Sequence, residues 1–458
     1  MSTQRPPAPD PDLVARLARL GVSLGTAGLP VPARGGAPAP DAARPRPGTR
    51  AEPWDAPSAA TEAAWEASLD AAPIEGVIAG VEAANAHGRC FVHTHARDAG
   101  EPYGGPALGE ALVACTRSLA ELANRPTLAA IDVARAAFVD TETTGLSGGA
   151  GTFAFLVGVG RFVDGRFEVR QFFMRDPGEE RAQLAAVAEW VDGCTGVVTF
   201  NGRSFDVPLL ASRYAFHRAR LPFADDLHLD LLHPARRLWR RRLASCALQS
   251  LERHILGIER TGDVPGWLIP ARYTDYQRTG DARPLAPVFE HNQLDILSMV
   301  GLVTHLARAY GDPAAALAHG EDWLSLARTY AARGEWRRVI DACGDALATG
   351  LAGADADEAQ YHLSMAARRL GEWDRAVAVW AAQAAVHPPR RLYPFEELAK
   401  YWEHRAPVAD AARALRYAER ARDLVAAGLL RPRRGRAVAL SDLDHRIARL
   451  RRKAGAAA

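Results

Sequence analysis

The pattern of hydrophobic and polar residues predicts strands and helices in the middle of the chain and helices alone toward its end. An apolar stretch at Phe138 that ends in Asp140-Thr141-Glu142 is typical of a strand, as is a β-branched run at 197–200. A turn and a helix start follow the second run. Residues 290–300 read as an apolar helix. From about residue 319 to 425 the pattern is helical throughout and repetitive.

The repetition is clearest in two long segments. WLSLARTYAARGEWRRVIDACGDAL is echoed by YHLSMAARRLGEWDRAVAVWAAQAAV, with Gly-Glu-Trp turns at 334–336 and 371–373, and a weaker third copy follows. These segments resemble tetratricopeptide repeats, whose paired helices stack into a concave surface. We therefore expect helical repeats over 319–425 and a surface there for a protein partner. Trp336 and Trp373 are expected to pack between helices.

Acidic residues follow the first predicted strand. The strand reads FVDTETTGL, and Asp140 and Glu142 stand one residue apart where it opens into a Thr-Gly loop. We expect the two carboxylates to converge there on one divalent cation, because Mg²⁺ and Mn²⁺ prefer oxygen ligands. Taken alone, this pair is weak evidence for a metal site, because acidic pairs at loop starts are common.

Two further acidic elements lie downstream. Asp206 follows the strand and turn in VVTFNGRSFDVPLL, where the alternative is a helix-capping role. In EHNQLDILSMV, His291 and Asp295 are four residues apart, so both lie on one face of a helix. An Asp in an apolar helix needs a partner, and a metal ion is one way to supply it. Asp230, among apolar residues, is expected to play a supporting role.

Together these segments resemble the DEDD (DnaQ-like) 3′ to 5′ exonuclease superfamily, and most closely its YprB-type ribonuclease H-like group. The resemblance runs over about residues 135–310 and rests on FVDTETTGLSGGAGTFAFLVGVG, FNGRSFDVPLL, LHLDLLHPARRLW, LQSLERHILGIERTGDVPGWLIP and HNQLDILSMV, in that order. It implies an α/β ribonuclease H-like domain, with a mixed sheet flanked by helices, over 131–312. It also implies a metal site made of Asp140, Glu142, Asp206 and Asp295.

The chemistry of such a site explains these residue types. Four carboxylates can hold two Mg²⁺ or Mn²⁺ ions about 3.5 to 4 Å apart, one orienting a hydroxide and the other stabilising the leaving oxygen of a phosphodiester. His291 is the candidate general base. Histidine-type family members usually have His and Asp five residues apart, whereas His291 and Asp295 are four apart, which is the spacing of the tyrosine-type branch.

Substrate contacts are expected beside the carboxylates and in the basic run HPARRLWRRR at 233–242. Guanidinium groups suit phosphate, and an aromatic ring can stack on an unpaired base. A solvated helix face with its tryptophan in the core is an equal alternative for this run. The glycine-rich loop at 145–151 is either a nucleotide contact or a simple hairpin connection. The aromatic stretch at 264–276 either lines a nucleic-acid channel or covers the core. The candidate contact residues are Thr143, Asn201, Phe205, Arg236, Arg237 and Trp239.

Composition limits what surrounds this site. The net charge is +2, so attraction to nucleic acid must come from local patches. Lysine occurs only at Lys400 and Lys453, and arginine carries almost all positive charge. The five cysteines are scattered without a Cys-x-x-Cys pair, which indicates a reducing compartment and no zinc ribbon. In CFVHTH, Cys90, His93 and His95 fit a strand better than a metal cluster.

The ends of the chain differ from its middle. Residues 1–60 are rich in Pro, Ala, Gly and Arg and are expected to be disordered, and 61–130 form a lead-in that packs on the nuclease core. Residues 426–458 form a basic tail. No segment approaches the ~20 apolar residues of a membrane span, so a cytoplasmic protein is expected.

These features predict a metal-dependent 3′ to 5′ exonuclease that acts on single-stranded RNA or DNA. The polarity and the end preference come from the family resemblance alone. One alternative is a nucleic-acid-binding scaffold that uses its helical repeats for protein interaction, with little or no catalysis. Another is an endonuclease acting on structured substrates.

Overall fold

The computed structural model describes residues 71–145, 151–223, 226–430, 432 and 435–455. The segment 1–60, expected to be disordered, lies outside these residues, as do Gly148 and Gly149 of the glycine-rich loop. Within the described residues no helix is long and apolar enough to cross a membrane.

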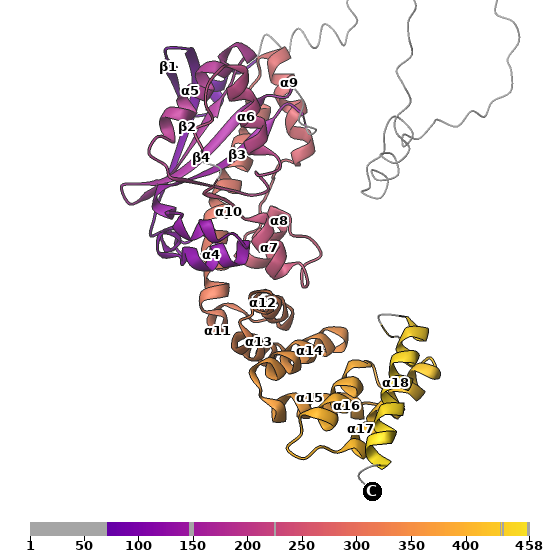
Figure 1. The fold of residues 1–458 in the computed structure, drawn as a ribbon. Coiled ribbons are helices and arrows are strands. Elements are labelled where there is room, and N and C mark those ends of the chain that lie inside the picture. The colour runs from indigo at the N-terminus through magenta and orange to yellow at the C-terminus, as the bar shows by residue number, and fades with distance from the viewer. Residues whose placement is uncertain (1–70, 146–150, 224–225, 431, 433–434, 456–458) are drawn as a thin grey trace, which may run out of the picture. The chain divides into compact units, whose positions relative to one another are not determined.

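A mixed sheet of seven strands forms the centre of the first half of the chain (Figure 1). Four neighbouring pairs are antiparallel, and β6 continues the sheet by pairing parallel with both β3 and β7. In spatial order the strands are β1 (Val81–Asn85), β2 (Gly88–Asp98), β5 (Arg166–Phe173), β4 (Ala154–Val163), β3 (Ala136–Thr143), β6 (Gly196–Thr199) and β7 (His228–Asp230). This mixed sheet, flanked by helices, confirms the fold class expected from the sequence.

The lead-in segment contributes to this sheet. β1 and β2 both precede residue 131, and β2 pairs along its length with β5. Cys90, His93 and His95 lie on β2, where the alternation of CFVHTH put them. Before and after these two strands come the short helices α3 (Ile74–Val77) and α4 (Thr116–Ala123).

Helices cover both faces of the sheet, and β3 shows which residues face which side. Ala137 and Val139 pack in one hydrophobic cluster with α5 (Glu180–Trp190) and α6 (Asp206–Phe216). Phe138 packs in another with Ile296 of the long helix α10 (Ala286–Gly311). Because successive side chains of a strand alternate between faces, the even-numbered residues of β3 face α10.

Shorter helices connect the sheet to the helical part of the chain. A five-residue π-helix, Glu252–Leu256, and a 3₁₀ turn, Gly266–Leu268, lie between them. The α-helices of this region are α7 (Leu232–Trp239), α8 (Leu248–Leu251), α9 (Ile269–Thr279) and α11 (Pro313–Ala316).

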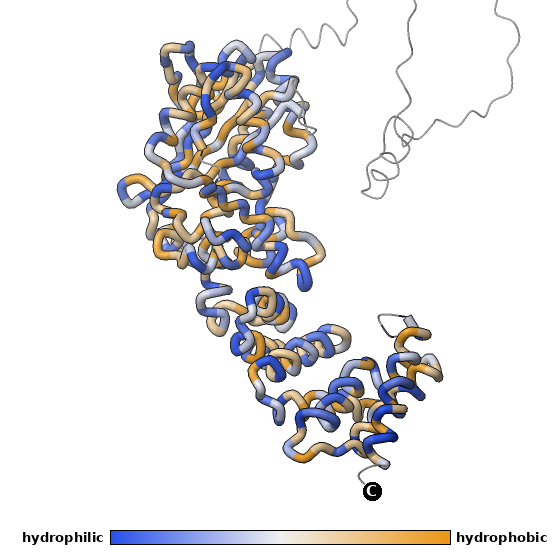
Figure 2. Tube along the Cα trace, viewed as in Figure 1, coloured by the Kyte–Doolittle hydropathy of each residue, from blue (hydrophilic) through white to orange (hydrophobic). Residues whose placement is uncertain are grey.

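The rest of the described chain is all-helical, and each helix contacts the next one along the sequence. Figure 2 shows hydrophobic and hydrophilic residues alternating along these helices, as expected where one face of each helix is buried. The helices are α12 (Gly320–Arg333), α13 (Trp336–Ala348), α14 (Gly353–Leu370), α15 (Trp373–Ala385), α16 (Tyr393–His404), α17 (Ala411–Ala426) and α18 (Arg436–Gly455).

The two Gly-Glu-Trp turns have the same geometry. Gly334 and Gly371 end α12 and α14 with φ of 76° and 78°, a left-handed conformation that glycine adopts without steric cost. The next helix begins at the tryptophan in both places. Trp336 and Trp373 pack against the hydrophobic core, in keeping with the packing role expected for them. The turns thus mark equivalent points of a helical repeat, while the tetratricopeptide assignment stays a prediction.

A buried carboxylate holds the last helix. The Glu403 side chain on α16 is fully buried and accepts hydrogen bonds from Arg449 Nε and Nη2 and from Lys453 Nζ, each at 2.9 Å. Although burial opposes it, these hydrogen bonds lower the pKa of Glu403 to about 2. The ionised carboxylate therefore stabilises the packing of α18 on α16.

Glu403→Gln is expected to lower the free energy of unfolding by about 2 kcal/mol, because charge-assisted hydrogen bonds to three cations, Arg446, Arg449 and Lys453, are lost. The folded pKa lies below the usual 4.5, so this contribution is present above pH 4.5 and is lost as the pH falls toward about 2. Urea unfolding at pH 7 and pH 3 measures both effects. Glu419→Gln, which removes an exposed ion pair with Arg451 between α17 and α18, is the control and should change little. Equal effects of the two substitutions would contradict the assignment.

Candidate functional site

Asp140 and Glu142 project from β3 toward α10. We expected the pair to converge at the strand end, where the strand opens into the Thr-Gly loop. β3 runs on to Thr143, and both residues are paired in register within it, with Gly158 and Leu156 of β4. Residues two apart in a strand point to the same face, so the strand itself brings the two carboxylates together. Glu142 is buried, and Asp140 is half-buried.

Asn292 on α10 fixes Asp140. Its Nδ2 donates to Asp140 Oδ2 at 2.8 Å, and its Oδ1 accepts from Gln171 Nε2 on β5 at 2.8 Å. Space for the amide comes from Gly158, since a Cβ there would lie 2.1 Å from Asn292 Oδ1. Sequence reasoning missed Asn292, although it stands next to His291 in the motif HNQLD. The contacts of the Asn292 amide with Gln171 and Asp140 join residues far apart in the sequence, so only the three-dimensional structure shows them.

Asp206 joins from the other side of β3. β6 pairs with β3 only as far as Phe138, and beyond that point Thr141 donates to Asp206 Oδ1 through its N–H at 3.1 Å and its hydroxyl at 2.5 Å. Asp206 is the first residue of α6, and Phe205 holds the N-cap position that was the alternative for Asp206. A buried ion pair between Arg213 on α6 and Glu180 on α5 holds the helix in place.

Asp230 anchors the turn that leads to Asp206. Its two carboxylate oxygens accept from the backbone N–H groups of Asn201 at 2.8 Å and Arg203 at 3.1 Å, and Oδ1 also accepts from Leu232 at 3.1 Å. Asn201 has a φ of +67°, a conformation that asparagine tolerates better than most residues. Asp230 therefore acts through the backbone, which agrees with the supporting role expected for it.

The carboxylates are close enough to perturb one another. Burial, followed by the charges of Asp295 and Asp206, raises the pKa of Asp140 well above its usual range. Burial and then the charges of Asp140 and Asp295 do the same for the pKa of Glu142. Burial also raises the pKa of Asp206 to about 6, against the hydrogen bonds from Thr141. The group is therefore destabilised when ionised and favours the approach of a cation.

His291 and Asp295 lie one turn apart on α10 and face Glu142. His291 Nε2 is 3.8 Å from Asp295 Oδ2 and 4.0 Å from Glu142 Oε1. On its other side, His291 Nδ1 is 2.7 Å from Asp263 Oδ1, which fixes the orientation of the imidazole. Asp263 belongs to the segment LGIERTGDVPG, which sequence reasoning used for the resemblance without assigning it chemistry.

Exposed aromatic rings flank the carboxylates in the sequence. Phe205, directly before Asp206, is 53% exposed, and Trp267, four residues after Asp263, is 69% exposed. Thr143 donates its hydroxyl to the carbonyl of Gly145 at 2.8 Å, at the start of the β3–β4 connection. The other aromatic residues of the predicted insertion, Tyr273 and Tyr276, are buried and cover the core.

The basic run divides between surface and core. Arg236 and Arg237 are exposed on α7, while Trp239 is 3% exposed and packs in the hydrophobic core. The expectation that Trp239 stacks on a base is therefore wrong for this structure, because its ring is covered by apolar neighbours. Arg242 pairs with Asp322 on α12 at 2.9 Å. Arg241 pairs with Asp355 and Glu358 on α14, so two of these arginines join the sheet-containing part to the helices.

The donor set fits a hard divalent cation in its chemistry, since Asp140, Glu142, Asp206 and Asp295 supply only carboxylate oxygens. Among the described residues, however, no group of three or more His, Cys, Asp or Glu side chains could hold a metal ion as it stands. Three of the carboxylates are engaged by protein donors, namely Asn292, Thr141 and Arg260. A cation that takes those particular carboxylate oxygens would therefore compete with these donors.

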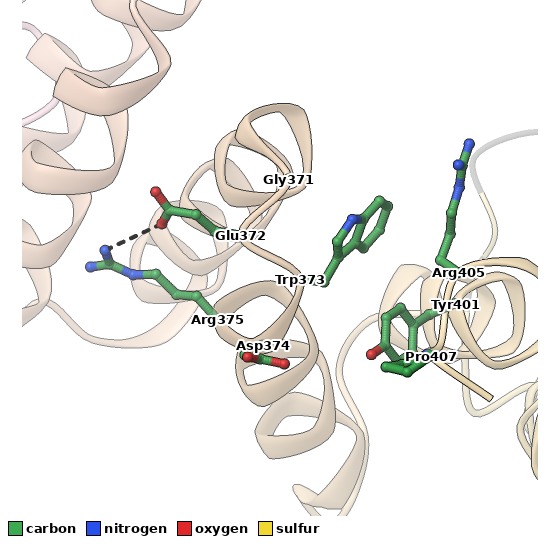
Figure 3. A pocket seen from close by; sticks show the side chains of 8 residues that line it. All are labelled: Gly371, Glu372, Trp373, Asp374, Arg375, Tyr401, Arg405 and Pro407. Carbon is green, nitrogen blue, oxygen red and sulfur yellow. Dashed lines mark ion pairs between the residues drawn. The ribbon is translucent and has the colours of Figure 1, made fainter.

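A separate pocket of about 510 Å³ lies in the helical part, beside the second Gly-Glu-Trp turn. In Figure 3, Trp373 extends toward Tyr401 and Arg405. The Trp373 and Tyr401 rings are 5.8 Å apart, and the Arg405 guanidinium carbon is 5.9 Å from the Trp373 ring centroid. These contacts are internal packing between α15 and α16, and no carboxylate of the site described above lines this pocket.

Comparison with known proteins agrees with this architecture. A family model for the RNase_H superfamily matches residues 137–307, which include all the carboxylates of the site. The chain is also 33% identical to YprB of Bacillus subtilis (strain 168) over 318 residues, covering 69% of this chain and 74% of YprB. Residues 137–307 therefore form a ribonuclease H superfamily domain, and the chain belongs to the family of YprB.

One solved structure gives a more distant match. The family B DNA polymerase from the hyperthermophilic archaeon Pyrobaculum calidifontis matches at 16% identity and a TM-score of 0.28, covering 43% of this chain and 29% of the polymerase chain. The chain thus spans less than a third of that polymerase, and a likeness of this size carries no statement about function.

Mn²⁺ is expected to raise the melting temperature of the full chain, because a ligand that binds only the folded state stabilises it. Glu142→Gln should raise the melting temperature in EDTA by about 2–4 °C, since it removes one buried negative charge from the cluster. Glu142→Gln should also reduce the rise in melting temperature that Mn²⁺ causes. Thermal denaturation in EDTA and in Mn²⁺ measures both, with the exposed Asp192→Asn as control. A parent protein indifferent to Mn²⁺ would argue against a metal site here.

Proposed function

We propose that this protein is a metal-dependent nuclease that hydrolyses phosphodiester bonds, acting as a 3′ to 5′ exonuclease on single-stranded nucleic acid. The observation that carries the proposal is the convergence of Asp140 and Glu142 from β3 with Asp295 from α10 and Asp206 from α6. Burial raises the pKa of Asp140, Glu142 and Asp206. Membership of the ribonuclease H superfamily supports nuclease chemistry. The 3′ to 5′ polarity rests on the family resemblance.

The four carboxylates would hold the divalent cations, Mg²⁺ or Mn²⁺. When bound, such ions lower the pKa of water and stabilise charge on phosphate oxygens. Asn292 keeps Asp140 oriented, and Thr141 does the same for Asp206. The chain thus supplies a cluster of carboxylates, two of which are oriented by neutral donors.

His291 is the proposed general base. Its Nδ1 lies 2.7 Å from Asp263, so a proton on Nδ1 would be donated to that carboxylate and Nε2 would be left to accept one. Nε2 faces the carboxylate group, between Glu142 and Asp295. The four-residue spacing on α10 supports this placement, because residues i and i+4 share a helix face.

A single-stranded substrate is favoured by the exposed rings of Phe205 and Trp267. Aromatic stacking suits unpaired bases of any sequence, and bases inside a duplex are not available for it. Arg236 and Arg237 are exposed and can approach phosphate. The helical part of the chain is proposed to bind a protein partner.

An alternative is a nucleic-acid-binding scaffold without catalysis. The retention of all four carboxylates at a cost to folding argues against it, since a binding role does not need buried charges that repel one another. An endonuclease would share the same chemistry and would differ in needing no end.

The nuclease proposal is tested with end-labelled single-stranded RNA and DNA in Mg²⁺ or Mn²⁺. We expect stepwise loss from the 3′ end, with circular substrates spared, and a fall of at least about a hundredfold on Asp140→Ala, because the carboxylate group acts as a unit. The exposed Asp192→Ala is the matched control and should retain activity. Cleavage of the circles would indicate an endonuclease. No cleavage, with equal binding by parent and Asp140→Ala, would favour the scaffold.

Trp267→Ala is expected to raise KM for single-stranded substrate about tenfold with little change in kcat, because stacking contributes about 1–3 kcal/mol per base. Steady-state kinetics on a short oligonucleotide measure both constants. Phe216→Ala removes a similarly exposed ring at the far end of α6 and serves as the control. A loss confined to kcat would instead place Trp267 in support of the reacting groups.

A further inference from the structure

Arg260 lies among the carboxylates of the proposed site. Its side chain is 6% exposed, and its Nη2 donates to both Asp295 and Glu252. Its Nη1 is 3.3 Å from Asp263 Oδ2 and 3.4 Å from His291 Nδ1. The guanidinium therefore contacts one proposed metal ligand, the proposed general base and the carboxylate that orients that base.

The position of Arg260 is built into the fold. Glu252, its second partner, is 1% exposed and sits at the start of the π-helix, where it also accepts a hydrogen bond from Ser298 of α10 at 2.5 Å. The segment that carries Arg260 is bounded by Gly257 and Gly262, which have φ of 67° and 74°. Glu252 thus accepts from the same nitrogen, Nη2, that donates to Asp295, and it anchors the guanidinium there.

The ion pair places Arg260 in competition with a metal ion. Asp295 Oδ1 accepts from the guanidinium, while its Oδ2 is 3.8 Å from His291 Nε2. A guanidinium and a divalent cation cannot share the same carboxylate oxygen, because both need it at contact distance and they repel each other.

We propose that Arg260 is an internal counter-cation of the carboxylate group, and that a divalent cation can use Asp295 Oδ1 as a ligand only by displacing it. This inference rests on the proposed metal-dependent function. It predicts two unequal classes of Mn²⁺ binding. The weaker class depends on Asp295, and its affinity is held down by Arg260.

The test measures Mn²⁺ binding to the full chain by calorimetry and by electron paramagnetic resonance of the free ion. Arg260→Met should tighten the weaker binding step about tenfold or more, which corresponds to about 1.4 kcal/mol. Arg260→Lys keeps the positive charge and should stay closer to the parent. In an Asp295→Asn background the weaker step should be absent, and Arg260→Met should then change nothing.

Removal of Arg260 leaves Glu252 buried without its cation, which can unfold the chain. The double variant Glu252→Gln, Arg260→Met removes both charges and should tighten Mn²⁺ binding in the same way. Circular dichroism checks that each variant is folded.

The possible outcomes separate the two proposals. Suppose that the parent binds Mn²⁺ and cleaves nucleic acid, and that Arg260→Met and the double variant are both folded. If Mn²⁺ binding is then unchanged or weaker in both variants, the role of Arg260 is overturned and the metal-dependent function is not. A parent and variants that all fail to bind Mn²⁺ would overturn the metal-dependent function and the counter-cation with it.

Discussion

The candidate site depends on one crossing, where α10 passes over β3. Asn292 on the helix donates to Asp140 on the strand, and Gly158 on the neighbouring strand leaves the space that the amide needs. The same crossing brings His291 and Asp295 to Glu142. Side chains return to the same face every two residues in a strand and about every 3.6 residues in a helix. Only a few side chains of each element therefore point at the other where they cross. The site residues are among those side chains.

Burying carboxylates is costly, and the surrounding contacts reflect that cost. Neutral donors hold Asp140 and Asp206, a histidine pairs with Asp263, and an arginine pairs with Asp295. None of these contacts removes the repulsion between Asp140 and Glu142, whose pKa values stay raised. Carboxylates with strongly shifted pKa values are most often found at functional sites. Their oxygen atoms are the ligands that hard divalent cations prefer.

The helical part is held differently. Its helices pack in sequence order, with left-handed glycines at equivalent turns and tryptophans against the core. Arg241 and Arg242 connect this part to α7 through carboxylates on α14 and α12. These arginines looked like phosphate ligands in the sequence, but their partners are acidic residues about eighty to over a hundred positions away.

The sequence alone determined the features that depend on local order. The β-branched runs, the acidic pair on β3, the His-Asp spacing on α10 and the Gly-Glu-Trp turns were all predictable, because each follows from a repeat of two or of 3.6 residues, or from glycine's freedom at a turn. The tertiary structure decided the rest. Asp206 binds Thr141, Asn292 locks Asp140, Arg260 holds Asp295 and Trp239 is buried in the core. Each of these facts depends on how elements distant in the chain pack together, and local periodicity carries no information about that packing.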